Sequence, residues 1–153
     1  MRIVGDYHFA ADRLSVWRAL NDPEVLRRAI PGCETMDRAS DVEWHGRVVV
    51  RVWPIKATFD GIVRLSELAP PDRYRITIEA DAPLLGTAGG SAIVTLTADP
   101  NGGTKLTYDA ETEIGGRLAQ LGGRLVQSAG TKYADKFFAR FAEAMDEVEA
   151  EKS

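Results

Sequence analysis

The last third of the chain carries an apolar stripe that only a long helix presents on one face. Its members recur every three or four residues: Leu118, Leu121, Leu125, Ala129, Tyr133, Phe137, Phe141, Met145 and Val148. At 1.5 Å per residue, such a helix would measure about 46 Å. A helix of this length needs a partner surface that is equally long, so the stripe predicts one long helix lying across a whole sheet.

The sheet is predicted by the segment from Met36 to Ile114, where the apolar period changes to two. Between Ile55 and Leu65, for example, every odd position is apolar. Turn signals divide the segment into about five or six strands, at Ala39-Ser40-Asp41, Trp53-Pro54, Pro70-Pro71-Asp72, Pro83 to Gly90 and Pro100 to Gly103. The alternation indicates an antiparallel sheet with one dry face and one solvated face.

The segment before this sheet predicts one strand and two short helices. Arg2 to Phe9 alternates like a strand, Asp12 can cap a first helix, and Asp22-Pro23 can start a second that ends near Pro31. We therefore expect a single α+β domain over residues 1–153, with all helices on one side of the sheet. Acidic residues at a helix C-terminus oppose the helix dipole, so we expect residues 142–153 to fray.

A curved sheet cannot close tightly against a straight helix, so this architecture predicts an apolar cavity between them. We expect Phe137, Phe138 and Phe141 to pack on the two short helices instead. The candidate cavity residues are Ile30, Trp44, Phe59, Val63, Ile78, Leu85, Val94, Tyr108, Leu118, Leu121 and Leu125. The alternative interpretation of the same apolar positions is a filled core.

No arrangement of residues predicts catalysis, a metal site or a cofactor. His8 and His45 fall on outward strand positions, and Cys33 follows a helix stop, where a small buried thiol is common. The glycines 86, 89 and 90 precede a strand without a following Gly-Lys-Ser, which excludes a phosphate loop. The net charge of -4 is unfavourable for nucleic-acid binding. A single cysteine fits a reducing cytoplasm.

Two surface features predict contact with a membrane or an acidic partner. Leu84 and Leu85 occupy a hairpin connection, where polar turn residues are usual. Basic residues, among them Arg117 and Arg124, predominate in the first part of the long helix. Two alternatives stay open, because the leucines can tuck under the sheet and the basic residues can form an ordinary solvated face.

Three stretches of the sequence carry a family resemblance. They are Asn21 to Leu26 running into Ile30-Pro31-Gly32-Cys33, then Gly115 to Gly122, and finally Lys132 to Phe138 with Phe141. On these stretches the chain resembles the CoxG family of carbon monoxide dehydrogenase subunits, which belongs to the START-like or Bet v 1-like (SRPBCC) superfamily of helix-grip proteins. The resemblance implies an apolar cavity. It also implies an accessory role for the aerobic molybdenum-containing CO dehydrogenase.

This role suggests a physical task, because electrons from a soluble oxidoreductase must reach a water-insoluble quinone pool. We therefore hypothesise that the chain binds an apolar small molecule or lipid, with isoprenoid quinone as the preferred ligand. It would work in the cytoplasm or peripherally at the inner face of the cell membrane. Two alternatives remain: an adaptor that recruits or matures the dehydrogenase, and an aromatase/cyclase-like enzyme. An enzyme would need polar groups in the cavity, where the sequence offers only Tyr74, Tyr108 and Thr112.

Overall fold

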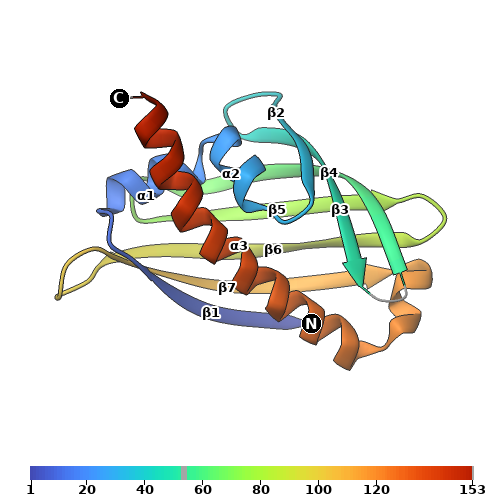
Figure 1. Ribbon diagram of the computed structural model, residues 1–153. Coiled ribbons are helices and arrows are strands. Elements are labelled where there is room, and N and C mark those ends of the chain that lie inside the picture. The colour runs from blue at the N-terminus through green and yellow to red at the C-terminus, as the bar shows by residue number, and fades with distance from the viewer. Residues whose placement is uncertain (53–54, 153) are drawn as a thin grey trace.

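A computed structural model of the chain describes residues 1–52 and 55–152. Seven strands form one antiparallel sheet in the order β1-β7-β6-β5-β4-β3-β2 (Figure 1). The elements are, in chain order, β1 (Arg2–Phe9), α1 (Arg13–Leu20), α2 (Pro23–Ala29), β2 (Cys33–Arg38), β3 (Glu43–Val52), β4 (Ile55–Ala69), β5 (Arg73–Ala82), β6 (Gly86–Ala98), β7 (Thr104–Gly115), the 3-10 helix η1 (Gly116–Leu121) and α3 (Gly123–Lys152). The predicted turn at Trp53-Pro54 lies outside the described residues.

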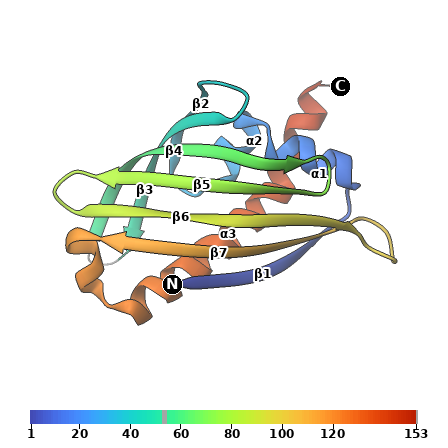
Figure 2. The same cartoon turned by 180° about the vertical axis from the view of Figure 1, so that it is seen from behind.

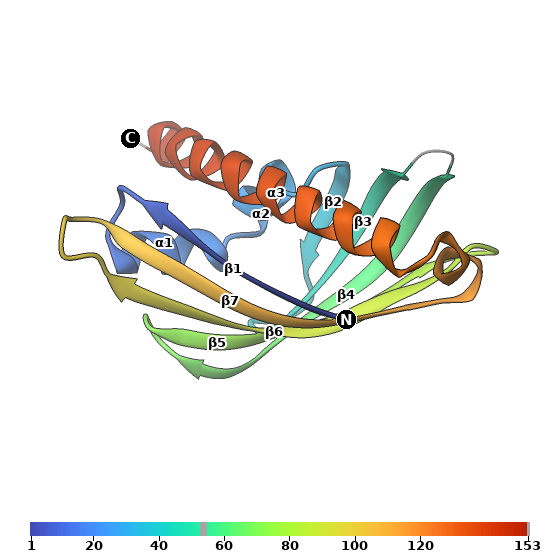
Figure 3. The same ribbon diagram turned by 90° about the horizontal axis from the view of Figure 1, so that it is seen from below.

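The helices lie on one side of the curved sheet. Helix α3 crosses the concave face, and α1 and α2 lie under its C-terminal half (Figure 3). Seen from behind, the other face of the sheet is not covered by any helix (Figure 2). This arrangement confirms the predicted α+β helix-grip fold.

The two short helices begin where the sequence predicts. The Asp12 carboxylate accepts a hydrogen bond from the Ser15 backbone N–H at 2.8 Å, and Asp22 accepts one from Glu24 at 2.9 Å. Such caps satisfy donors that have no partner within the first turn of a helix. Pro23 follows as the first residue of α2, where its missing N–H is no disadvantage.

The prediction of one uninterrupted helix from Leu118 to Val148 is wrong. Leu118 and Leu121 belong to the separate 3-10 helix η1, and Gly122 then takes a φ of 89° before α3 begins. The spacing of three between the two leucines fits a 3-10 turn as well as an α-helix. Since a left-handed backbone suits glycine above all other residues, Gly122 ends η1 and redirects the chain into α3.

The predicted turn from Pro83 to Gly90 is shorter in the structure, because β6 already begins at Gly86. Gly86 and Gly90 are strand residues with φ values of 141° and 157°. A Cβ at either position would lie 2.1 Å from a backbone carbonyl oxygen of β7. These glycines therefore serve a close approach of two strands and not a wide turn.

The C-terminal end of α3 also differs from the expected frayed segment. The helix continues to Lys152, and Arg28 of α2 contacts Glu147 at 3.4 Å and Glu151 at 2.9 Å. Lys152 in turn lies 3.3 Å from Asp22. The acidic residues therefore find basic partners on α2, which offsets their unfavourable position in the helix dipole.

This charge network predicts a defined loss of stability in acid. Hydrogen bonds from Arg27 and Arg28 lower the pKa of Glu24 to about 2. A carboxylate whose pKa is lowered in the folded state stabilises it above the unfolded pKa of about 4.3. This contribution disappears as the pH falls from about 4.3 towards 2. In urea unfolding, Glu24→Gln should lose less stability over that interval than the wild type does.

An exposed carboxylate on β2 supplies the control for this prediction. Glu34→Gln removes the same charge from a side chain that forms no ion pair with any described residue, and it should follow the acid profile of the wild type. Equal acid sensitivity in Glu24→Gln and the wild type would contradict the assignment.

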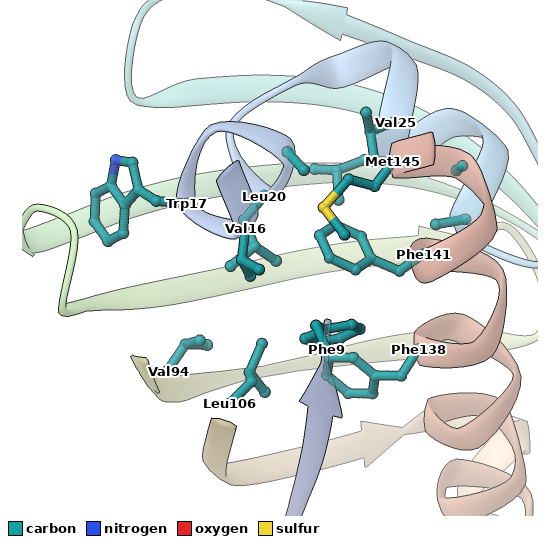
Figure 4. Close-up of a cluster of buried hydrophobic side chains, with 14 of the residues drawn as sticks. Phe9, Val16, Trp17, Leu20, Val25, Val94, Leu106, Phe138, Phe141 and Met145 are labelled. Atoms are coloured by element: carbon teal, nitrogen blue, oxygen red, sulfur yellow. The ribbon is translucent and has the colours of Figure 1, made fainter. Parts of the chain in front are cut away.

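The core is concentrated at the end of the molecule where α1, α2 and the second half of α3 meet the sheet (Figure 4). Phe141 is fully buried and lies edge-on to Phe9, with ring centroids 5.4 Å apart. Phe138 stacks on Tyr7 at 4.3 Å, so the expectation that it packs on the short helices is wrong. Its partners are on β1 and β7 because Tyr7 and Tyr108 face inward there.

Candidate apolar-ligand site

Two close approaches join the first half of α3 to the rest of the molecule. On one side, Gly130 lies so close to β1 that a Cβ there would be 3.1 Å from the Ile3 Cδ1 atom. On the other side, the Tyr133 hydroxyl donates a 2.6 Å hydrogen bond to the carbonyl oxygen of Pro31. From these contacts to its C-terminus, α3 covers the packed core.

The part of α3 before these contacts covers the sheet incompletely. Leu125 belongs to the predicted inward stripe, yet its side chain is 41% exposed. Ile78 lies on the inward face of β5, four residues after the buried Tyr74, and its side chain is also 41% exposed. Because Ile78 faces the interior and still contacts solvent, α3 leaves this part of the sheet uncovered.

Small side chains line this uncovered part of the sheet. Gly61, Ala80 and Ala88 are cross-strand neighbours on β4, β5 and β6. Ala92 and Ala110 are paired on β6 and β7. We define the uncovered inner face by the partly exposed residues at inward strand positions, together with two leucines of the predicted apolar stripe; they are Phe59, Gly61, Val63, Ile78, Ala80, Ala88, Gly90, Ala92 and Ala110 of the sheet, and Leu121 and Leu125 of the stripe.

Two hydrogen-bond donors in the interior lack a partner among the described residues. The Trp44 indole N–H is buried without an acceptor, in a side chain that is 1% exposed. The Tyr108 hydroxyl makes no hydrogen bond with any residue that the structure describes. Burial, followed by the charge of Asp135, raises the pKa of Tyr108 and keeps this phenol neutral. The Tyr108 hydroxyl can therefore donate a hydrogen bond to an acceptor such as a carbonyl oxygen, whereas the Trp44 N–H is enclosed in the core.

The groups that could have carried acid–base or nucleophilic chemistry lie elsewhere. His8 and His45 are exposed beside Asp99 and Glu43, on the outer face as predicted. Cys33 is half-buried, and this burial raises the pKa of its thiol, which donates to the Thr35 carbonyl oxygen at 3.2 Å. Within residues 1–52 and 55–152, no group of His, Cys, Asp and Glu is arranged to hold a metal ion.

The sequence matches the family model of the carbon monoxide dehydrogenase G subunit (CoxG) over residues 5–146. The chain belongs to the CoxG family. No curated protein sequence matches it.

Solved structures show how widely the fold of this CoxG chain is shared. A conserved protein from Geobacillus kaustophilus superposes with a TM-score of 0.89 at 21% identity, covering 96% of both chains. The Zhui aromatase/cyclase from Streptomyces sp. R1128 superposes with a TM-score of 0.65 at 18% identity, covering 97% of this chain and 95% of its own. At such identities the likeness establishes the fold alone.

The CoxG structure separates the predicted cavity residues into two groups. Trp44, Val94 and Leu118 are buried, the first two in the packed core. Phe59, Val63, Ile78, Leu121 and Leu125 belong to the uncovered inner face, and Tyr108 stacks on Phe138 between the two regions. The small residues Gly61, Ala80, Ala88, Ala92 and Ala110 were not predicted to shape the site. The signal for them in the sequence is the recurrence of glycine and alanine at inward positions of consecutive strands.

Ile30 follows α2 directly and packs against the core. It lines a polar depression of about 330 Å³ between α2 and α3, together with Arg27, Arg28, Gly32, Cys33, Arg140, Glu143, Ala144 and Glu147. A second depression of about 330 Å³ lies beside α1 and the C-terminal part of α3, lined by residues such as Ser15 and Lys152. Neither depression includes the uncovered inner face, so we do not assign the apolar ligand to them.

The predicted membrane contacts occupy one end of the molecule. Leu84 is 91% exposed, whereas Leu85 is half-buried and its carbonyl oxygen accepts a 2.9 Å hydrogen bond from the Leu118 N–H. Arg117 and Arg124 are exposed on η1 and on the first turn of α3. None of the described helices has the length and apolar character that crossing a membrane requires.

Proposed function

We propose that this CoxG protein is a non-catalytic carrier that holds an elongated apolar ligand against the uncovered inner face and serves aerobic CO dehydrogenase. The observation that carries the proposal is the 41% exposure of Ile78 on the inward face of β5. Covering apolar surface is favourable by roughly 25 cal/mol per Å². An apolar molecule that lies between α3 and the sheet would gain this free energy.

Isoprenoid quinone is the ligand that we propose within this class. The isoprenoid tail is apolar like the uncovered inner face. The quinone ring carries two carbonyl oxygens, which accept hydrogen bonds and do not donate them. The Tyr108 hydroxyl supports this choice, because it makes no hydrogen bond with any described residue and can donate one to a quinone carbonyl oxygen. In this role the protein would act in the cytoplasm and peripherally at the inner face of the cell membrane, between the dehydrogenase and the quinone pool.

Substitutions along α3 test whether the ligand lies under its first half. Leu125→Trp should change the free energy of unfolding by less than about 1 kcal/mol, because the indole can extend into open space, but it should weaken binding of a long ligand. Phe138→Trp should lower stability by roughly 1–3 kcal/mol, since this residue is 8% exposed and close-packed. Thermal unfolding and titration with decylubiquinone measure both effects.

A Leu125→Trp protein that loses stability and binds decylubiquinone normally would contradict this placement. The two alternative functions have their own signatures. An adaptor without a ligand would yield no quinone in mass spectrometry of the organic extract from protein purified from its native host. An aromatase/cyclase would convert an added polyketide substrate, and its rate would depend on the interior hydroxyl groups.

A further inference from the structure

One end of the molecule gathers exposed groups that the carrier role alone does not explain. The β3–β4 and β5–β6 hairpins, η1 and the first turns of α3 all lie there, opposite the end that holds α1 and the C-terminus (Figures 1 and 3). We call this region the hairpin-end surface, and we define it by Arg51, Lys56, Leu84, Arg117 and Arg124.

Leu84 is the most exposed large apolar side chain of the described residues, at 91%. It stands in the three-residue connection between β5 and β6 with a φ of 69°, in the left-handed region that leucine rarely adopts. The Leu85 N–H closes this turn by donating to the Ala82 carbonyl oxygen at 3.0 Å. The hairpin therefore presents an apolar side chain to solvent at its tip. This is unfavourable both for the exposed apolar surface and for the backbone of a leucine.

At the same end of the molecule, two cations of the sheet lie opposite each other without a neighbouring carboxylate among the described residues. Arg47 faces Asp60 across β3 and β4 at 3.0 Å. Four residues further along the same pair of strands, Arg51 lies directly opposite Lys56. Like charges directly opposite each other in a sheet are destabilising. This arrangement becomes favourable when an external anion neutralises it.

The other cations of the surface are also available. Among the described residues, no carboxylate lies within ion-pair distance of Arg51, Lys56, Arg117 or Arg124. Two acids at the same end, Asp81 and Glu113, are exposed on the outer face of the sheet and form no ion pair with these cations. The hairpin-end surface is therefore basic on a chain whose net charge is -4.

We propose that the hairpin-end surface docks on an anionic lipid bilayer, with Leu84 inserted among the lipids. A protein interface of ordinary size has a broad apolar core, whereas the described residues of this surface offer one projecting leucine and four exposed cations at the same end of the molecule. Such a tip fits the boundary between headgroups and acyl chains, and the cations fit anionic headgroups. The proposal extends the carrier function, because docking would bring the uncovered inner face next to the source of the ligand.

Co-sedimentation with vesicles tests the docking surface. The full chain should bind vesicles that contain phosphatidylglycerol and should bind phosphatidylcholine vesicles at least about tenfold more weakly. Leu84→Asp should reduce binding at every salt concentration. Arg51→Glu combined with Lys56→Glu should reduce it mainly at low salt, because the Debye length falls from about 30 Å at 0.01 M to about 10 Å at 0.1 M.

The opposite end of the molecule provides matched controls. Leu68 is 42% exposed near the β4–β5 turn, and Arg73 is an exposed cation at the same turn. Leu68→Asp and Arg73→Glu should bind vesicles like the wild type. The proposal is overturned if these controls and the hairpin-end variants behave alike, or if phosphatidylcholine vesicles bind as well as anionic ones.

A titration with decylubiquinone in the absence of vesicles separates this proposal from the carrier function. Normal titration together with no vesicle binding would overturn the docking surface alone. Vesicle binding by a chain that does not bind decylubiquinone would overturn the carrier function alone.

Discussion

Ala80→Phe is expected to abolish binding of a long apolar ligand while leaving the protein folded. Ala80 pairs with Gly61 on β4 and with Ala88 on β6, so small side chains flank it on both sides. A phenyl ring at this position would occupy the space that we assign to the ligand. We expect the affinity for decylubiquinone to fall at least tenfold, or about 1.4 kcal/mol. Fluorescence titration measures this loss, and urea unfolding measures the stability.

The outer face of the same strand gives a control for this substitution. Thr77 lies on β5 at an outward position, where its neighbours are Arg64 and Ser91. Thr77→Phe adds a ring of the same size to the other side of the sheet and should leave ligand affinity unchanged. If Ala80→Phe lowers the free energy of unfolding by roughly 1–3 kcal/mol and the affinity stays normal, the surface around Ala80 is close-packed core and the ligand lies elsewhere.

Phe141→Ala should have the largest effect on stability of the substitutions considered. The Phe141 side chain is fully buried and contacts the rings of Phe9 and Phe137. Removing a buried phenyl group leaves a space that the surrounding side chains fill only in part. A loss of about 3–5 kcal/mol in the free energy of unfolding is therefore expected. Urea denaturation with a linear extrapolation measures it.

Leu125→Ala is the matched control on the same helix. About four turns before Phe141, the Leu125 side chain is 41% exposed, so its truncation should cost less than about 1 kcal/mol. Comparable losses for the two variants would mean that the first half of α3 is packed as tightly as the second. That result would contradict the distinction between the core and the uncovered inner face.

The sequence allowed the element types and the fold to be predicted because local patterns decide them. The caps at Asp12 and Asp22 and the alternation along β1 depend on neighbours within a few residues. The break at Gly122 was missed because the apolar spacing of three or four residues runs from η1 into α3 without interruption. The ordered C-terminal end was missed for a different reason, since Arg28 and Glu151 are distant in the sequence.

The candidate site was predictable only in part. Alternation identifies which residues of a strand face inward, and it placed Val63, Ile78 and Val94 correctly on the inner face of the sheet. It cannot tell whether an inward residue is covered, because this depends on where α3 crosses the sheet. Val94 is 7% exposed and Ile78 is 41% exposed, although both are inward-facing, branched aliphatic residues.

The one-sided position of the core has an evolutionary consequence. Selection for a stable fold acts mainly on the half of the molecule around Phe9, Phe138 and Phe141, where α3 is anchored. Substitutions on the uncovered inner face, at Ala80, Ala88 or Ala92, are less constrained by the stability of the fold. Single exchanges of these small residues can therefore reshape the inner face of the sheet at little cost in stability.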